Sequence, residues 1–156
     1  MDATTKQLLI EIGITQAQLT RQLKSVAADQ DWKPAPEEWS FRFIAAHLAT
    51  TEKECYQDRV MRIAVGESPH FESYFNTGRD FGTLDLLDSL RAWAATRQEI
   101  VDCASDLSEA QLALTGTHAA FGTLTVQGVL QLMLDHDREH IRDLEKALAS
   151  YKSKGK

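Results

Sequence analysis

The sequence is poor in the residues that mark secreted, fibrous, membrane-spanning or nucleic-acid-binding proteins. Its two cysteines, Cys55 and Cys103, cannot form the disulfide framework of a secreted domain, so we expect a reducing cytoplasm as its location. Three prolines and 8 glycines in 156 residues exclude a collagen-like or low-complexity chain. No apolar run is long enough to span a membrane, and the first residues, MDATTKQLLIEIG, do not resemble a signal peptide. Lys and Arg number 17 against 23 Asp and Glu, which gives a net charge of −6, so we do not expect a nucleic-acid partner.

What the sequence does contain is a set of long amphipathic stripes. Hydrophobic residues make up 43% of the chain, and they recur at intervals of three and four, which is the pattern of helices that pack on one face. Four such helices in a chain of this length predict an all-α four-helix bundle. The predicted helices cover residues 3–27, 40–63, 83–105 and 125 to about 150, with Ser40, Thr83 and Thr125 as the expected N-caps.

The connections complete the predicted domain. Residues 64–82 mix glycine, proline and scattered aromatics without a period, so we expect a long ordered loop, and loops of this length often serve a function. Residues 106–114 predict a short helical turn, and no strand is expected. We expect one domain over residues 1–150 and a frayed tail over residues 151–156.

Histidines interrupt the inward faces of two predicted helices. His136 and His140 lie one turn apart at the edge of the inward face of the last helix, where two imidazoles project to the same side and can share one metal ion. This spacing alone is a weak signal, because two edge histidines that simply reach water are a common alternative. His47 strengthens the signal, since it shares the inward face of the second helix with Ile44 and Leu48.

The heights of the three histidines match in one arrangement of the helices. His47 lies about 10 Å from the start of the second helix, whereas His136 and His140 lie about 17 and 22 Å from the start of the last helix. If these two helices run antiparallel over about 36 Å, all three imidazoles lie close together. That arrangement requires an up-down-down-up topology, in which the loop at residues 64–82 crosses the length of the bundle.

The residues around these histidines resemble a known family. PEEWSFRFIAAHL, with Trp39, Ser40 and His47, and DHDREH, with His136 and His140, are similar to the DinB family, also called the YfiT-like metal-dependent hydrolase superfamily. The resemblance covers nearly the whole chain. It implies an up-down-down-up bundle, a three-histidine metal site at His47, His136 and His140, and a homodimer. It also implies one divalent ion, zinc or nickel above all, and, in relatives with assigned activity, a low-molecular-weight thiol as cosubstrate.

Three imidazole ligands would leave coordination positions open, as in catalytic rather than structural metal sites. An ion in such a site is a Lewis acid that lowers the pKa of a bound water or of a substrate thiol. We therefore expect a metal-dependent enzyme that acts on a small molecule, either as a hydrolase or as a thiol transferase. A metal-binding stress-response or interaction module without turnover is the alternative, and a cavity beside the histidines would favour the enzyme.

Charged residues on the helices form a second group of candidates. Arg97 and Asp137 fall inside the apolar stripes of their helices at nearly the same height, so we expect them to pair with each other. A role in supporting the metal ligands or in binding a substrate anion is the alternative for both. Glu52, Glu54 and Glu139 are predicted to lie on outward or edge faces.

The remaining candidates are predicted to be structural or to lie at the surface. Cys55 lies about 12 Å along the helix from His47, so we interpret it as a small core residue. His70 and His118 are interpreted as structural or surface residues, with contact to a substrate as the less favoured alternative for His70. Exposed aromatic side chains of the long loop are expected to cover a homodimer interface or the mouth of the site, namely Phe71, Tyr74 and Phe75.

Overall fold

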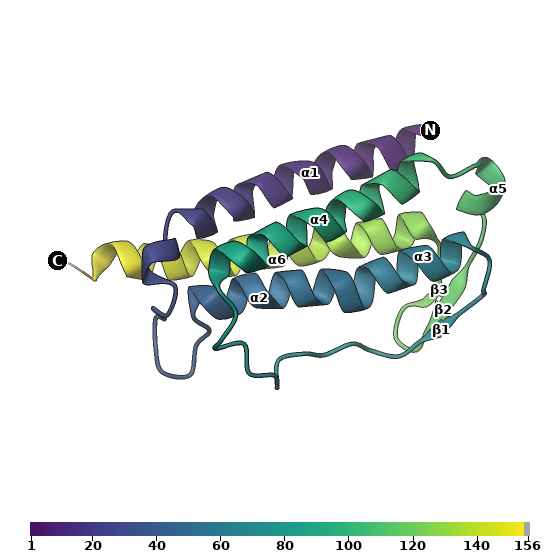
Figure 1. Ribbon diagram of the computed structural model, residues 1–156. Helices are drawn as coiled ribbons and strands as arrows, with labels where there is room; N and C mark the ends of the chain where they lie inside the picture. The colour runs from purple at the N-terminus through teal and green to yellow at the C-terminus, as the bar shows by residue number, and fades with distance from the viewer. Residues whose placement is uncertain (155–156) are drawn as a thin grey trace.

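The chain forms four long helical rods and one small sheet, as seen in a computed structural model that describes residues 1–154 (Figure 1). The protein is therefore mostly helical, as predicted. The first, third and fourth rods are α1 (Ala3–Lys24), α4 (Leu86–Ser105) and α6 (Val126–Ser153). The second rod is continuous and consists of α2 (Phe41–Thr51), the π-helix η2 (Glu52–Gln57) and α3 (Asp58–Ala64). The short elements are η1 (Ala27–Asp29), β1 (His70–Phe71), α5 (Glu109–Leu112), β2 (Gly116–His118) and β3 (Gly122–Leu124). Within residues 1–154, no helix has the length and apolarity needed to span a membrane.

Side-chain caps set the starts of the helices, and one cap differs from the prediction. Ser40 and Thr125 each accept a backbone N–H from the first turn of the following helix at 3.1 Å, as expected for N-caps. α4 begins later than predicted from Thr83, because Asp85 is its cap. Gln30 fixes this start, since its side-chain oxygen accepts the first N–H of α4 at 2.7 Å while its amide donates to Asp85. This contact joins distant parts of the chain, so local periodicity could not predict it.

The second rod contains one extra residue in its middle turn. Hydrogen bonds in a π-helix span five residues instead of four, so η2 rotates the face that later residues present by about 100°. Burial follows this rotation: Ile44 and Leu48 are buried before η2, and Val60 and Ile63 after it, although these positions do not share one stripe of a regular helix. Glu52, at the start of η2, is only 2% exposed, so the prediction that it faces outward is wrong. It is buried because α4 packs on this side of the rod and supplies a charged partner.

A small three-stranded sheet, which the sequence analysis did not predict, joins two distant segments. β1 pairs in parallel with β2, which pairs antiparallel with β3. Strands of two and three residues are too short to show the alternation on which a sequence-based prediction depends. Gly116 allows the close approach of β1 and β2, because a Cβ at this position would lie 2.9 Å from the carbonyl oxygen of Pro69. The pairing also sets His118 opposite Phe71.

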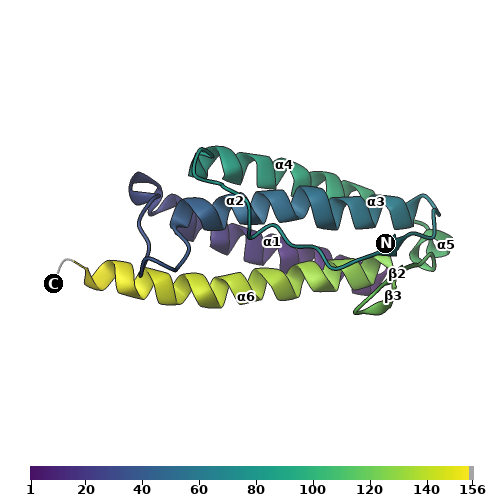
Figure 2. The ribbon, with the colours of Figure 1, turned by 90° about the horizontal axis from the view of Figure 1, so that it is seen from below.

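Residues 65–85 connect the second rod to α4 and run along the outside of the bundle (Figure 2). They leave the end of α3 and return to the end of the bundle at which α2 begins, so α2 and α4 start at the same end (Figure 1). The long loop predicted over residues 64–82 is thus close to the observed connection, apart from β1 within it. Its path lays Tyr74 and Asn76 against the second rod.

Two apolar clusters fill the interior of the bundle, and a polar layer separates them along every rod. One cluster includes Ile12, Val60, Ile100 and Met133. The other includes Leu19, Phe41, Trp93 and Leu144. Between these positions, four buried polar side chains, one from each rod, are joined by hydrogen bonds into what we call the polar layer: Thr15, Glu52, Arg97 and Asp137.

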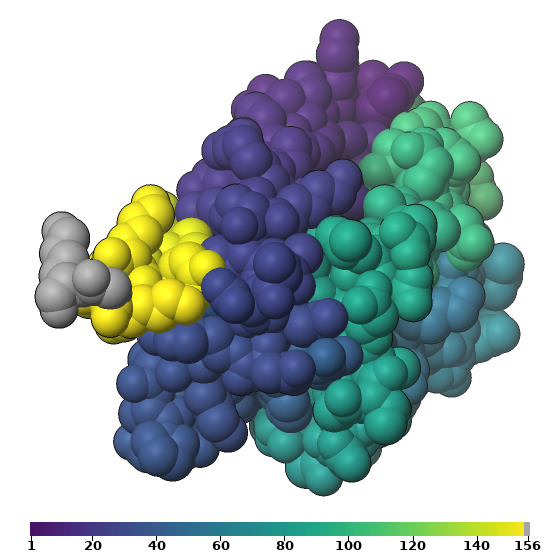
Figure 3. Space-filling view, turned by 60° about the vertical axis from the view of Figure 1, so that its left-hand side comes forward, coloured from purple at the N-terminus to yellow at the C-terminus, as the bar shows by residue number. Residues whose placement is uncertain are grey.

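The last turns of α6 extend beyond the predicted end of the domain at residue 150. Tyr151 lies within 5.2 and 5.5 Å, between ring centroids, of Trp32 and Phe41. Figure 3 shows the segment after α1 lying beside the last turns of α6 at this end of the bundle. These aromatic contacts hold the helix to Ser153, whereas residues 155–156 of the predicted frayed tail lie outside the described residues.

Candidate metal centre

The three histidines predicted as metal ligands lie together between α2 and α6. One ring nitrogen from each of His47, His136 and His140 lies within 4.8 Å of the other two. The Nε2 atoms of His136 and His140 are 2.9 Å apart. The ring centroid of His47 lies 5.4 Å from that of His136 and 4.9 Å from that of His140. The helical spacing and the matching heights therefore predicted this cluster correctly.

One pair of ligand atoms in the cluster has the spacing that a divalent metal ion requires. Zinc binds imidazole nitrogen at about 2.0–2.1 Å, so two nitrogens on one ion lie about 2.9–3.4 Å apart, depending on the coordination angle. The separation of 2.9 Å between the Nε2 atoms of His136 and His140 falls in this range. Three neutral imidazoles suit zinc, nickel, iron and copper alike, and they leave further coordination positions open.

Burial keeps these imidazoles uncharged. Burial, together with the smaller effects of the neighbouring His140 and His47, lowers the pKa of His136 from 6.5 to about 3. Burial, followed by the proximity of His47, lowers the pKa of His140 to about 4. The pKa of His47 is also lowered by burial, against the opposing effect of its hydrogen bond to Asn76. Neutral imidazoles at pH 7 have the lone pairs that a metal ion requires.

Asn76, in the long connection, orients His47. The side-chain oxygen of Asn76 lies 2.7 Å from Nδ1 of His47. Both amide hydrogens of Asn76 are used, because its nitrogen donates to Thr51 at 2.9 Å and to the hydroxyl of Tyr74 at 3.1 Å. The oxygen facing His47 is therefore an acceptor, so Nδ1 of His47 carries the proton and Nε2 has the free lone pair. Sequence reasoning missed Asn76, because nothing in the sequence around it marks which loop residue meets the histidines.

Trp39 packs against two of the histidines from the side. Its ring centroid lies 4.8 Å from that of His47 and 6.1 Å from that of His140, with the latter pair nearly parallel at 23°. Such packing restricts the side-chain rotamers of the imidazoles. Trp39 immediately precedes Ser40, the N-cap of α2. The start of this helix therefore also sets the position of the ring that packs against the histidines.

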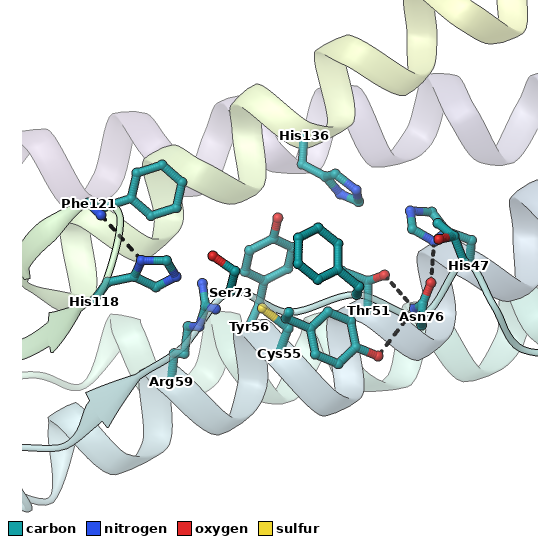
Figure 4. A pocket seen from close by; sticks show the side chains of 13 residues that line it. His47, Thr51, Cys55, Tyr56, Arg59, Ser73, Asn76, His118, Phe121 and His136 are labelled. Carbon is teal, nitrogen blue, oxygen red and sulfur yellow. Dashed lines mark hydrogen bonds between the residues drawn. The ribbon is translucent and has the colours of Figure 1, made fainter.

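A pocket of about 330 Å³ opens beside the histidine cluster (Figure 4). His47 and His136 lie at one end of it, and Arg59, Ser73 and His118 lie at the other end. The volume is at the small end of the range for ligand pockets, which fits a small molecule. Its rim carries two exposed aromatic side chains, Phe75 and Phe121.

Cys55 also lines this pocket, although it belongs to the apolar core as predicted. Burial raises the pKa of its thiol to about 11. The thiol is therefore protonated at neutral pH, and a nucleophile would need the thiolate. Cys55 acts as an uncharged wall of the pocket.

The predicted pair of Arg97 and Asp137 is present and forms part of a larger network. Arg97 donates to Asp137 at 2.6 and 3.1 Å and to Glu52 at 2.7 and 2.9 Å. A further bond at 3.0 Å goes to the backbone oxygen of Ile12. These bonds occupy the donors of the guanidinium, and neither Arg97 nor Asp137 lines the pocket. The structure thus leaves Arg97 no donor for a substrate anion.

The structure also places the remaining candidates, and it corrects the interpretation of two loop aromatics. His118 is only 4% exposed, which agrees with a structural residue, and it also lines the pocket. Phe71 is 6% exposed and Tyr74 is half-buried, so of the three loop aromatics only Phe75, at 81%, is exposed as predicted. His70 is exposed and bonds to Thr117, outside the pocket.

Comparisons with known proteins identify a family and a fold. The sequence matches the family model of the DinB superfamily over residues 13–144. The structure is similar to that of YfiT from Bacillus subtilis, which is described as a probable metal-dependent hydrolase with an unusual four-helix bundle topology. That match has a TM-score of 0.77 and 18% sequence identity, and it covers 94% of this chain and 87% of the other. At this identity the likeness shows the fold alone. No curated protein matches the sequence.

Proposed function

The chain belongs to the DinB superfamily, and we propose that it is a divalent-metal-dependent hydrolase that acts on a small molecule. The ligands would be His47, His136 and His140. One observation carries the proposal: three neutral imidazole nitrogens converge within 4.8 Å of one another, and two of these imidazoles, His47 and His136, line a pocket of about 330 Å³. A site that only retained a metal would not need a pocket beside its ligands, so the pocket favours an enzyme over a binding module.

The residues of the site have distinct parts in the proposed reaction. The three imidazoles would hold the ion, and Asn76 keeps Nε2 of His47 free for it. A divalent ion supplies Lewis-acid chemistry, which lowers the pKa of a water or of a thiol. The pocket would hold the substrate against this end, with Tyr56 and Cys55 as its uncharged wall. Burial raises the pKa of the Tyr56 hydroxyl, so that group is a hydrogen-bond donor at neutral pH.

Hydrolysis is the reaction that we propose because the structurally similar YfiT is described as a probable metal-dependent hydrolase. Transfer of a low-molecular-weight thiol, which the family resemblance also implies, is the alternative reaction.

In the same proposal, the up-down-down-up topology is supported by the common starting end of α2 and α4 (Figure 1). A single domain over residues 1–150 and assembly as a homodimer complete the proposal.

Elemental analysis of the purified protein tests the metal site directly. We expect about one divalent ion per chain, and His136→Ala should lower this content sharply while leaving the helical circular dichroism unchanged. His70→Ala is the matched control, because His70 is exposed and lies outside the cluster. Full occupancy in His136→Ala would overturn the site.

Activity assays then separate the reactions. Metal-loaded protein should hydrolyse members of a panel of small esters and amides without added thiol. Turnover only in the presence of a small thiol would replace hydrolysis by thiol transfer. Metal binding without turnover in either assay would favour the non-catalytic module.

A further inference from the structure

Arg59 is a buried cation without a charged partner among the described residues. Its side chain belongs to α3 and is 5% exposed. Within residues 1–154, its guanidinium makes one hydrogen bond, to the backbone oxygen of Glu72 at 3.3 Å, and no ion pair. The guanidinium also lies 5.4 Å from the ring centroid of Phe71. A guanidinium has five N–H donors, and a buried charge normally has an opposite charge beside it. Arg97, the other deeply buried arginine, has two such partners.

The unused donors of Arg59 face the pocket together with two other polar groups. Figure 4 shows Arg59, Ser73 and His118 gathered at the end of the pocket that lies away from His47 and His136. Nδ1 of His118 accepts the backbone N–H groups of Ala120 at 2.9 Å and Phe121 at 3.2 Å. His118 is therefore the tautomer that carries its proton on Nε2, the nitrogen turned toward the pocket.

All three groups at this end can donate hydrogen bonds, and one of them carries a permanent positive charge. A carboxylate at the same place would neutralise Arg59, but the carboxylates near it are engaged elsewhere or exposed. Glu54 pairs with Arg79 at 2.5 Å, and Glu72 points its side chain to His70 at 3.2 Å. The pocket thus presents donors without an acceptor of opposite charge.

We infer that Arg59, Ser73 and His118 bind an anionic group, a carboxylate or a phosphate, of the molecule that occupies the pocket. Guanidinium binds both groups through parallel charge-assisted hydrogen bonds. Insofar as this molecule is a substrate, the inference rests on the proposed function. The substrate class is then a small molecule with its anionic group at one end and its reacting group at the other. The length of the pocket between Arg59 and the histidines sets the separation of the two groups.

Anion binding to chelator-treated, metal-free protein tests the inference without any contribution from a metal ion. The probes are inorganic phosphate and succinate, titrated in separate calorimetric experiments at constant ionic strength. Arg59→Met should weaken the binding of at least one probe by roughly 10- to 100-fold, as expected for loss of a charge-assisted bond. The probe that wild-type protein binds more tightly identifies the group as phosphate or carboxylate.

Arg62→Met is the matched control. Arg62 lies on the same helix and also packs on Phe71, at 5.3 Å, but it pairs with Glu67 at 2.9 Å and does not line the pocket. Its loss removes the same charge and should change anion binding less than about twofold. Equal losses of anion binding in the two arginine variants would show that only the net charge matters, and would overturn the inference. Wild-type protein that binds neither probe would overturn it as well.

Ser73→Ala keeps the test decisive if Arg59→Met does not fold. It removes one hydroxyl group, leaves Arg59 in place and should weaken binding by roughly 3- to 10-fold. Unchanged binding in Ser73→Ala would then count against the site. Because all of these measurements use metal-free protein, their failure is distinguishable from the failure of the metal site, which the metal content of His136→Ala decides.

Discussion

The guanidinium of Arg97 and the carboxylate of Asp137 form a two-pronged pair in the interior of the bundle, with N–O distances of 2.6 and 3.1 Å. The carboxylate of Asp137 also accepts a bond from the hydroxyl of Thr15 at 2.5 Å. Glu52 binds the opposite side of the same guanidinium. Through these bonds the polar layer ties each rod of the bundle to a common centre. Asp137 lies next to His136 in the chain, so the layer also positions the turn of α6 that carries two of the three histidines.

Removal of Arg97 should destabilise the fold more than removal of either carboxylate. Arg97→Met leaves two buried negative charges without a partner, and we expect a loss of about 3–5 kcal/mol in the free energy of unfolding. Asp137→Asn leaves Arg97 paired with Glu52, so its cost should be smaller, about 1–3 kcal/mol. Urea unfolding at pH 7, followed by circular dichroism, measures both. Equal losses would contradict the three-residue network.

The destabilisation in Arg97→Met should shrink as the pH falls from 7 to 5. Burial already raises the pKa of Glu52 in the folded protein, against the opposing effect of Arg97. Without Arg97 this pKa should rise further, so the folded variant binds more protons than the unfolded chain at intermediate pH. Its stability then decreases with rising pH in this range. Unfolding midpoints for wild type and variant at the two pH values check the sign of the difference.

Metal-free protein should lose stability as the pH falls below 6.5. The pKa values of His136 and His140 are lowered to about 3 and about 4 in the folded state, from an ordinary value of 6.5. The contribution of the neutral imidazoles to the free energy of unfolding is therefore fully present above pH 6.5. It declines as the pH falls from 6.5 toward the pKa values of the folded state. Each histidine contributes up to about 1.4 kcal/mol per pH unit there. Urea unfolding with chelator present measures the slope of the free energy of unfolding against pH, and His136→Gln should reduce it by the equivalent of about one proton. An unchanged slope would show that His136 is not buried and neutral.

Asn76→Ala should weaken metal binding while leaving all three ligands in place. Without the acceptor at Nδ1, His47 can adopt the wrong tautomer or rotate, and loss of such a supporting bond typically costs roughly 10- to 100-fold in affinity. Asn76→Asp is the matched control, because it retains the acceptor oxygen and should keep affinity close to wild type. Competition with a chromophoric chelator gives the dissociation constants. Equal weakening in both variants would mean that Asn76 orders the loop rather than the imidazole.

The protein should self-associate as a homodimer through the surface around Phe75. This side chain is 81% exposed and lines the same pocket as Phe121, which is 57% exposed, and such apolar surface commonly marks an interface. Light scattering at tens of micromolar should give twice the mass of one chain, and Phe75→Ser should shift the population toward monomer. Glu37→Ser, at an exposed position of the connection before α2, is the control. A monomeric mass for wild type would contradict the prediction.

The sequence predicted the parts of the site that depend on regular helices. The spacing of His136 and His140 and the height of His47 follow from a fixed rise and rotation per residue. The same geometry predicted that Arg97 and Asp137 would meet. Residues within unbroken α-helices can be compared in this way even when they are far apart in the chain.

Residues outside regular helices could not be predicted on this basis. Asn76 and Ser73 lie in an irregular connection, where no period relates position to direction. His118 reaches the pocket through β2, whose pairing with β1 depends on a contact between distant segments. Glu52 was misplaced because its buried partner, Arg97, belongs to another helix, and a wheel drawn for one helix does not show such a pairing.

Because of the π-helix, the side chains at the two ends of the pocket point in directions that are set separately. His47 precedes η2 and Arg59 follows it, so the direction of each side chain is set by a separate stretch of regular helix. Deletion of one residue from η2 would restore a continuous α-helix and turn Arg59 by about 100° away from the pocket, while His47 would keep its place. With the π-helix in place, substitutions in α3 can change what the far end of the pocket binds. The histidines at the metal end do not move as a result. The metal end and the far end of this pocket can therefore diverge separately, although a single rod carries both.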